Sequence, residues 1–139
     1  MIPYKRHTLS NGLTVAVNRD RQSKLAAVNI LYKVGARNED PARTGFAHLF
    51  EHLMFRGTRR IPNFDLPVQM ACGDNNAFTN NDYTDFYITL PKDNVETALW
   101  LESDRMEGLD ITPEKLETEK RVVIEEFRQR YLNQPYGDQ

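Results

Sequence analysis

Gly-Phe-Ala-His-Leu-Phe-Glu-His-Leu-Met-Phe, residues 45–55, is a segment whose apolar periodicity predicts a helix. A spacing of four residues places His48 and His52 one above the other on the same face of that helix. Two neutral imidazoles in this arrangement can bind one Zn²⁺ from the same side, and Glu51 lies beside them as a candidate general base. The order His-x-x-Glu-His is the inverted form of the zincin motif. The segment therefore predicts a metallopeptidase centre.

The limits and packing of this helix also follow from the sequence. It is expected to extend to about Phe55, because Arg-Gly-Thr at residues 56–58 is a typical stop. Its apolar residues are predicted to pack into the core, and they are Phe46, Leu49, Leu53 and Phe50.

Composition limits the classes of function. A chain of 139 residues with 40% hydrophobic and 27% charged residues can form one compact domain. The net charge of −2 and the absence of a glycine-rich phosphate loop exclude nucleic acid and nucleotides as expected partners. The lone Cys72 forms no internal disulfide, so it does not indicate a compartment.

The chain is also expected to be soluble. Residues 1–7 lack the apolar core of a signal peptide, and no apolar run approaches the roughly 18 to 20 residues that span a bilayer. Localisation stays open between the cytoplasm and, if a signal peptide has been removed, the periplasm.

Five segments have the composition of strands. Residues 4–9 and 13–18 predict a hairpin, because Ser-Asn-Gly between them supplies the positive φ angles of a tight turn. Residues 25–34 are apolar nearly throughout, which favours a central strand covered on both faces. Residues 76–79 and 84–90 predict a second hairpin across residues 80–82.

Two helices are expected after the second hairpin. The first covers about residues 93–107, and its helically spaced Val95, Leu99, Glu102 and Met106, with Ala98 and Trp100 nearby, favour core packing. The second begins with Thr112 as N-cap and Pro at the next position and runs to about Leu132. Together the elements predict an α+β fold, in which helices pack on a mixed or antiparallel sheet.

A catalytic zinc normally has three protein ligands, so the two histidines need a partner from another element. In the last helix, Glu119, Val122, Val123 and Glu126 form one stripe that is acidic at both ends. Burial of the valines would bring both carboxylates toward the interior, where an unpaired charge is costly. The third ligand is therefore Glu126 or Glu119. Glu125, about 100° away around the helix, is expected to face solvent.

The same residues also allow plainer interpretations. His48 and His52 can be half-buried structural histidines, and Glu51 can be a surface charge. The glutamates of the last helix can be solvated, and Phe78 can be a core residue of an ordinary hairpin. A closed structural metal site is disfavoured, because it would need four protein ligands and Cys72 is not part of a Cys-x-x-Cys pair.

Several motifs in order along the chain resemble the pitrilysin or insulinase family of inverzincin zinc metallopeptidases. They are Leu-Ser-Asn-Gly-Leu-Thr at 9–14, Val-Gly-Ala-Arg-Asn-Glu at 34–39, residues 45–58, Asn-Ala-Phe-Thr at 76–79 and Glu-Lys-Arg-Val-Val-Ile-Glu-Glu at 119–126. By this resemblance, His48, His52 and Glu126 bind one Zn²⁺. Glu51 is then the general base that activates the water on the metal, and Glu119 is an acid behind the ligands.

The resemblance also implies a way of binding substrate. Asn76, Ala77 and Phe78 correspond to an edge strand to which an extended peptide adds through main-chain hydrogen bonds. The implied activity is that of an endopeptidase on short or unfolded polypeptides.

Members of the family fold such a segment as the start of a larger α/β sandwich domain. That domain pairs with a second, similar domain on the same chain or on a partner subunit. We therefore expect residues 1–139 to be the N-terminal part of a catalytic domain, with an unpaired sheet edge that permits homo-oligomers. The alternative function is a non-catalytic peptide-binding or assembly subunit of the same fold, inactive without its partner.

Overall fold

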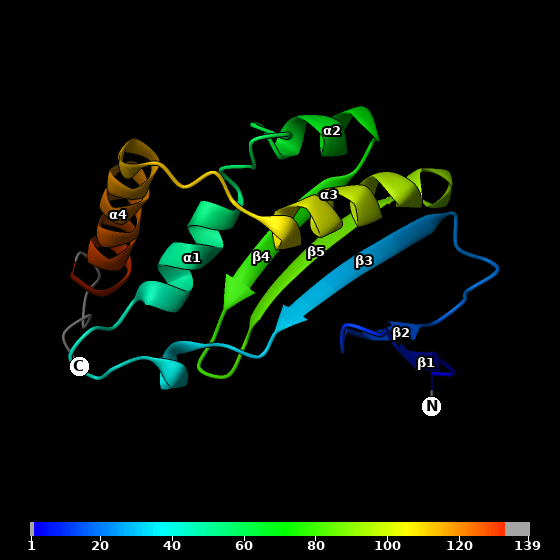
Figure 1. Cartoon of the computed structure of the whole chain (residues 1–139), viewed down its shortest axis with the longest axis horizontal. Helices are drawn as coiled ribbons and strands as arrows, with labels where there is room; N and C mark the ends of the chain where they lie inside the picture. The colour runs from blue at the N-terminus through cyan, green and yellow to red at the C-terminus, as the bar shows by residue number, and fades with distance from the viewer. Residues whose placement is uncertain (1, 133–139) are drawn as a thin grey trace.

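A computed structural model of the chain describes residues 2–132. Its main feature is an antiparallel sheet of three strands, β3 (Leu25–Tyr32), β4 (Asp74–Thr79) and β5 (Thr84–Pro91), in the order β3-β5-β4 (Figure 1). The predicted second hairpin is thus confirmed, with Thr79 opposite Thr84 at its closed end.

The predicted N-terminal hairpin is also confirmed. Strands β1 (Lys5–Thr8) and β2 (Thr14–Val17) pair antiparallel and form a separate two-stranded sheet beside the main one (Figure 1). Gly12 has a φ of 89° in the connecting turn, and its amide donates to the Leu9 carbonyl at 2.9 Å. A positive φ of this kind costs glycine little, which explains the turn position.

The α-helices of residues 2–132 are α1 (Phe46–Met54), α2 (Asp65–Met70), α3 (Val95–Glu107) and α4 (Pro113–Phe127). Short turns of helix lie at Ala36–Asn38, Lys92–Asn94 and Arg128–Leu132. Helices α1, α2 and α3 cover one face of the sheet, and α4 packs against α1 beyond the β4 edge (Figure 1). The centre of the core consists of Ile61, Phe64, Val68, Ile88, Leu90, Ala98 and Leu101.

The prediction that residues 25–34 form a central strand covered on both faces is wrong. In the described part of the chain β5 lies in the middle, and β3 lies at an edge with alternating exposure. Val28 of β3 packs against the core, whereas Leu25 and Leu31 are 57% and 50% exposed on the other face. A continuous apolar run does not distinguish one covered face from two.

The prediction for the helix at 93–107 is right in extent and right in part about its buried face, since Ala98 and Glu102 are buried and Val95 packs against the core. Leu99 and Met106 are exposed, as is the neighbouring Trp100, whereas Glu102 and Arg105 are buried. The two charged side chains pair with each other, and the Arg105 guanidinium stacks on the rings of Phe64 and Phe86 at 4.2 and 4.5 Å.

Burial of this pair changes the pKa of the Glu102 carboxyl. Desolvation raises its pKa, and the charge and hydrogen bonds of Arg105 oppose that rise. A charge that is paired and covered by aromatic rings can thus occupy a core position that apolar spacing alone does not assign to it.

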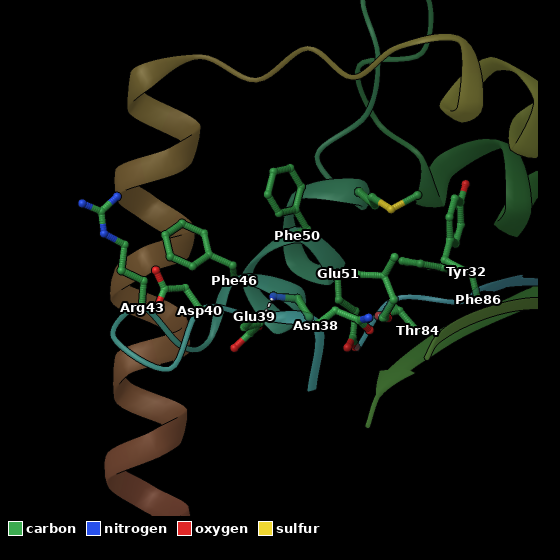
Figure 2. Close-up of a pocket in the computed structure, with 13 residues that line it drawn as sticks. Tyr32, Asn38, Glu39, Asp40, Arg43, Phe46, Phe50, Glu51, Thr84 and Phe86 are labelled. Atoms are coloured by element: carbon green, nitrogen blue, oxygen red, sulfur yellow. Dashed lines mark hydrogen bonds between the residues drawn. The ribbon is translucent and has the colours of Figure 1, made fainter. Parts of the chain in front are cut away.

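Helix α1 packs into the core through fewer residues than its sequence predicts. Leu53 is 2% exposed and Leu49 is partly buried, but Phe46 and Phe50 are about half exposed. Both phenylalanines instead line a cavity of about 590 Å³ between α1 and the ends of β3 and β5 (Figure 2). The prediction that Phe46 and Phe50 are core residues is therefore wrong.

Candidate metal centre

Helix α1 has a defined start that holds its histidines in place. Gly45 precedes it with a φ of 94°, and the Glu39 carboxylate accepts hydrogen bonds from the amides of Gly45 and Ala47, both at 2.7 Å. These contacts satisfy amides that lack partners inside the helix and place a negative charge at the positive end of its dipole. Glu39 is a positioning residue to which the sequence analysis assigned no role.

The two histidines meet one glutamate of α4. Nε2 of His48 lies 3.2 Å from Nε2 of His52. The Glu126 carboxylate lies 3.5 Å from the first of these nitrogens and 3.6 Å from the second. One ligand atom from each residue falls within 4.8 Å of the other two. The structure thus brings together the three residues that the resemblance implies as zinc ligands.

The spacing of these atoms fits a tetrahedral metal ion. Ligands about 2.05 Å from a tetrahedral zinc are about 3.3 Å from one another. The two imidazole nitrogens are 3.2 Å apart, close to this value, and each lies 3.5 to 3.6 Å from one of the two Glu126 oxygens, Oε2 for His48 and Oε1 for His52. Two imidazoles with one carboxylate are a donor set that zinc accepts. All three side chains are partly exposed, so an ion held by them would be accessible to water or substrate.

The second glutamate of the stripe lies behind the histidines. Oε2 of Glu119 is 3.1 Å from Nδ1 of His52, and the Glu119 side chain is only 4% exposed. A carboxylate can only accept, so Nδ1 carries the hydrogen and Nε2 keeps its lone pair for a metal. The two glutamates left open by the stripe therefore occupy different places, with Glu126 among the potential ligands and Glu119 behind His52.

Other residues of the stripe follow the prediction in part. Val123 is partly buried, but Val122 is 38% exposed, so only one of the two valines turns inward. Glu125 is exposed, as expected, and pairs with Arg128 at 3.5 Å.

Arg56, just beyond the end of α1, holds the other oxygen of Glu119. Its Nε donates to Oε1 at 2.5 Å, and Nη2 contacts the same oxygen. Each oxygen of the buried carboxylate thus has its own partner, Arg56 for Oε1 and His52 for Oε2. Burial of a carboxylate is tolerable only when it is paired in this way.

Replacing Arg56 by Met is expected to lower the free energy of unfolding by about 2 kcal/mol, because the buried Glu119 loses its cationic partner. Arg56→Lys should restore part of the loss. The measurement is urea denaturation followed by circular dichroism. Arg59→Met is the matched control, since the Arg59 side chain is 93% exposed and its one described ion pair, with Asp110, is long at 3.9 Å. Equal losses in the two Met variants would contradict the assignment.

Glu51 lines the cavities that contain the two histidines and is held by Thr79 of β4. The Thr79 hydroxyl donates to Oε2 of Glu51 at 2.5 Å and lies 3.2 Å from the Thr84 hydroxyl. Glu51 also lines the cavity shown in Figure 2. Thr79 belongs to a motif recognised in the sequence, but its contact with Glu51 depends on the packing of α1 on β4 and was not predicted.

Strand β4 presents a free edge next to this centre. Within the described residues it pairs only with β5. The amide of Ala77 donates to the side-chain oxygen of the adjacent Asn76 at 2.8 Å, as expected for an amide that faces away from β5. Phe78 is 43% exposed and contacts Tyr83 edge to face, so the interpretation of Phe78 as a core residue is wrong.

Two further cavities connect the β4 edge to the histidines. One, of about 530 Å³, is lined by His48, Glu51, Ala77 and Phe78 among others. The other, of about 450 Å³, is lined on β4 by Asn76 and Ala77 and on the helices by His52, Glu119 and Glu126. All the residues proposed for metal, base and substrate contacts thus border one continuous region of the surface.

The described residues contain no helix long and apolar enough to cross a membrane.

Known proteins with similar sequences are zinc proteases and processing peptidases. PqqE, a zinc protease of Helicobacter pylori, is 37% identical over 133 residues, which make up 94% of this chain and 30% of that protein. A probable mitochondrial-processing peptidase subunit beta of Arabidopsis thaliana is 29% identical over 124 residues, 88% of this chain and 23% of that protein.

Solved structures give the same result. The crystal structure of a protease from Helicobacter pylori superposes with a TM-score of 0.93 at 34% identity, over 99% of this chain and 33% of that one. Pitrilysin superposes with a TM-score of 0.82 at 25% identity, over 93% of this chain and 14% of that one. The α+β fold is therefore that of the pitrilysin-like proteases.

The chain spans a third or less of the length of these relatives. The sequence profile described as insulinase (peptidase family M16) matches residues 14–135, which is most of the chain. With its inverted His-x-x-Glu-His helix, this chain belongs to the insulinase family of peptidases, peptidase family M16.

Proposed function

We propose that this chain carries the zinc-binding part of a metalloendopeptidase that hydrolyses peptide bonds in short or unfolded polypeptides. The observation that carries the proposal is the convergence of His48, His52 and Glu126, whose ligand atoms lie within 4.8 Å of one another beside Glu51. Zinc proteases among the relatives support the same metal.

In this proposal each residue has a distinct task. His48, His52 and Glu126 hold one Zn²⁺, which supplies Lewis acidity toward water and the scissile carbonyl. Glu51 accepts the proton of the attacking water and later delivers it to the leaving amine. Thr79 orients Glu51 through its hydrogen bond, and Glu119 keeps the hydrogen of His52 on Nδ1.

The substrate is proposed to bind as an extra strand on the free edge of β4. Asn76, Ala77 and Phe78 border the cavities that reach the histidines, so a peptide along this edge passes the metal ligands. Main-chain recognition of this kind needs no particular side chain, which favours broad specificity. It also requires an extended peptide, which favours short or unfolded substrates.

A second homologous domain or a partner subunit is proposed to complete the active site. The chain spans a third or less of the length of the relatives that it matches. Its contribution would be groups that stabilise the developing charge on the scissile carbonyl.

The test is hydrolysis of a quenched, unstructured fluorescent peptide by the zinc-loaded chain, with and without a chelator. We expect slow cleavage that the chelator abolishes and added Zn²⁺ restores, together with binding of one equivalent of zinc. Cleavage that persists with the chelator would contradict a zinc enzyme. Zinc binding without cleavage would contradict activity of this segment alone, and would leave both an active site that needs its second domain and the non-catalytic subunit.

A further inference from the structure

Arg130 lies one helical turn beyond the proposed ligand Glu126, at the junction of the two cavities next to β4. It lines both the cavity that contains His48 and the cavity that contains His52. Only Glu51 and Ala77 share this property, the proposed base and the middle of the proposed peptide-binding edge. Any peptide that passes along Ala77 toward the metal ligands therefore passes Arg130.

The Arg130 side chain is exposed, and it makes no ion pair or hydrogen bond with another of the residues 2–132. The other arginine of these two cavities, Arg56, is paired with Glu119. Arg128, two positions earlier on the same turn, pairs with Glu125 and lines neither cavity. Of the two described arginines that border these cavities, Arg130 is thus the one without an acidic partner among the described residues.

The carboxylates around these cavities already have partners. Glu39 accepts from the amides at the start of α1, Glu51 accepts from Thr79, and Asp65 accepts from Asn75. Glu119 and Glu126 face the two histidines. A carboxylate of a bound peptide could therefore pair with the Arg130 guanidinium without displacing any of these acidic groups.

We propose that Arg130 is a specificity-determining residue that binds a carboxylate side chain of the substrate close to the scissile bond. The guanidinium presents a planar pair of donors that matches both oxygens of a carboxylate. The strand-addition edge supplies affinity without sequence preference, and Arg130 adds a preference for Asp or Glu at the position that faces α4. This inference rests on the proposed peptidase function and names the substrate class within it.

The test separates peptide binding from hydrolysis. Zinc-loaded Glu51→Gln protein is titrated against fluorescein-labelled unstructured peptides that differ only in Glu or Gln at one position, and that position is moved along the peptide. We expect one position at which Glu binds about tenfold more tightly than Gln, as a charge-assisted hydrogen bond gives. The difference should shrink as salt is raised.

Arg130→Gln in the same background should abolish this preference, and Arg130→Glu should favour Lys at that position instead. Arg128→Gln is the matched control, which removes an arginine from the same turn and should leave the preference unchanged. Circular dichroism and zinc stoichiometry check that each variant is folded and loaded.

Each remaining outcome has a defined meaning. Equal affinity for Glu and Gln peptides, or a preference that survives Arg130→Gln, would overturn the role of Arg130 and leave the peptidase proposal intact. Equal weakening of both peptides by Arg130→Gln would assign the cation to the peptide main chain and also overturn it. Zinc binding without binding of any peptide would refute both the proposed substrate site and Arg130 as its selector.

Discussion

Glu51→Gln is expected to reduce hydrolysis of an unstructured peptide by about 10³-fold, the typical contribution of a general acid–base residue, while zinc stays bound. The amide of Gln cannot accept a proton at neutral pH, so the attacking water loses its base. The variant should still fold, because the Gln carbonyl oxygen can accept the Thr79 hydrogen bond that Glu51 accepts at 2.5 Å. The measurements are initial cleavage rate and zinc content after dialysis.

A second variant distinguishes the base from its support. Thr79→Val keeps the shape of the side chain and removes the hydroxyl that holds Glu51. We expect a loss of about tenfold in rate, since Glu51 keeps its chemistry but loses its orientation. Loss of zinc from the Glu51→Gln protein would contradict this assignment, because it would make Glu51 a ligand. An unchanged cleavage rate in the Glu51→Gln protein would identify the activity as that of a contaminating protease.

The elements with strong local signals were predicted correctly from the sequence. Both hairpins, the helix at 46–54 and the two later helices occur close to the predicted limits. Their turns, caps and periodicity lie within a few residues of one another, so short-range reasoning suffices. Helix α2 was missed because it has only 6 residues and includes Pro67, so it offers too little periodicity.

The errors concern which face of an element is buried. The sequence made β3 central and placed Leu99 and Met106 of α3 in the core, where both are instead exposed. In the structure β5 is central, and α3 turns the paired Glu102 and Arg105 inward. Both errors have one cause, since burial depends on what packs against a face, and the aromatic rings around Arg105 come from distant parts of the chain.

The metal centre shows the same division between local and tertiary information. The spacing of His48 and His52 was sufficient to predict that they share a helix face. The acidic stripe of α4 left Glu119 and Glu126 as equal candidates, and the family resemblance favoured Glu126. The packing of α4 against α1 gives the physical distinction, with Glu126 facing Nε2 of His52 and Glu119 facing Nδ1 of the same ring.

Glu126→Ala is expected to weaken zinc binding by about 10²- to 10³-fold, because a structural zinc site of four ligands is worth roughly 10–16 kcal/mol, about 3 kcal/mol for each ligand. Glu119→Gln should weaken it by about 10- to 100-fold, as loss of a group that orients a ligand typically does. Competition with a chromophoric chelator measures both.

The matched control for this comparison is Glu125→Gln, since Glu125 is adjacent in sequence, exposed and paired only with Arg128 among the contacts described. It should leave zinc affinity unchanged, which would exclude a general effect of charge on α4. A larger loss for Glu119→Gln than for Glu126→Ala would reverse the two roles. The ordering expected here follows from distance, because Glu126 lies within 3.6 Å of both nitrogens that are proposed as ligands, whereas Glu119 would act on the metal only through the His52 ring.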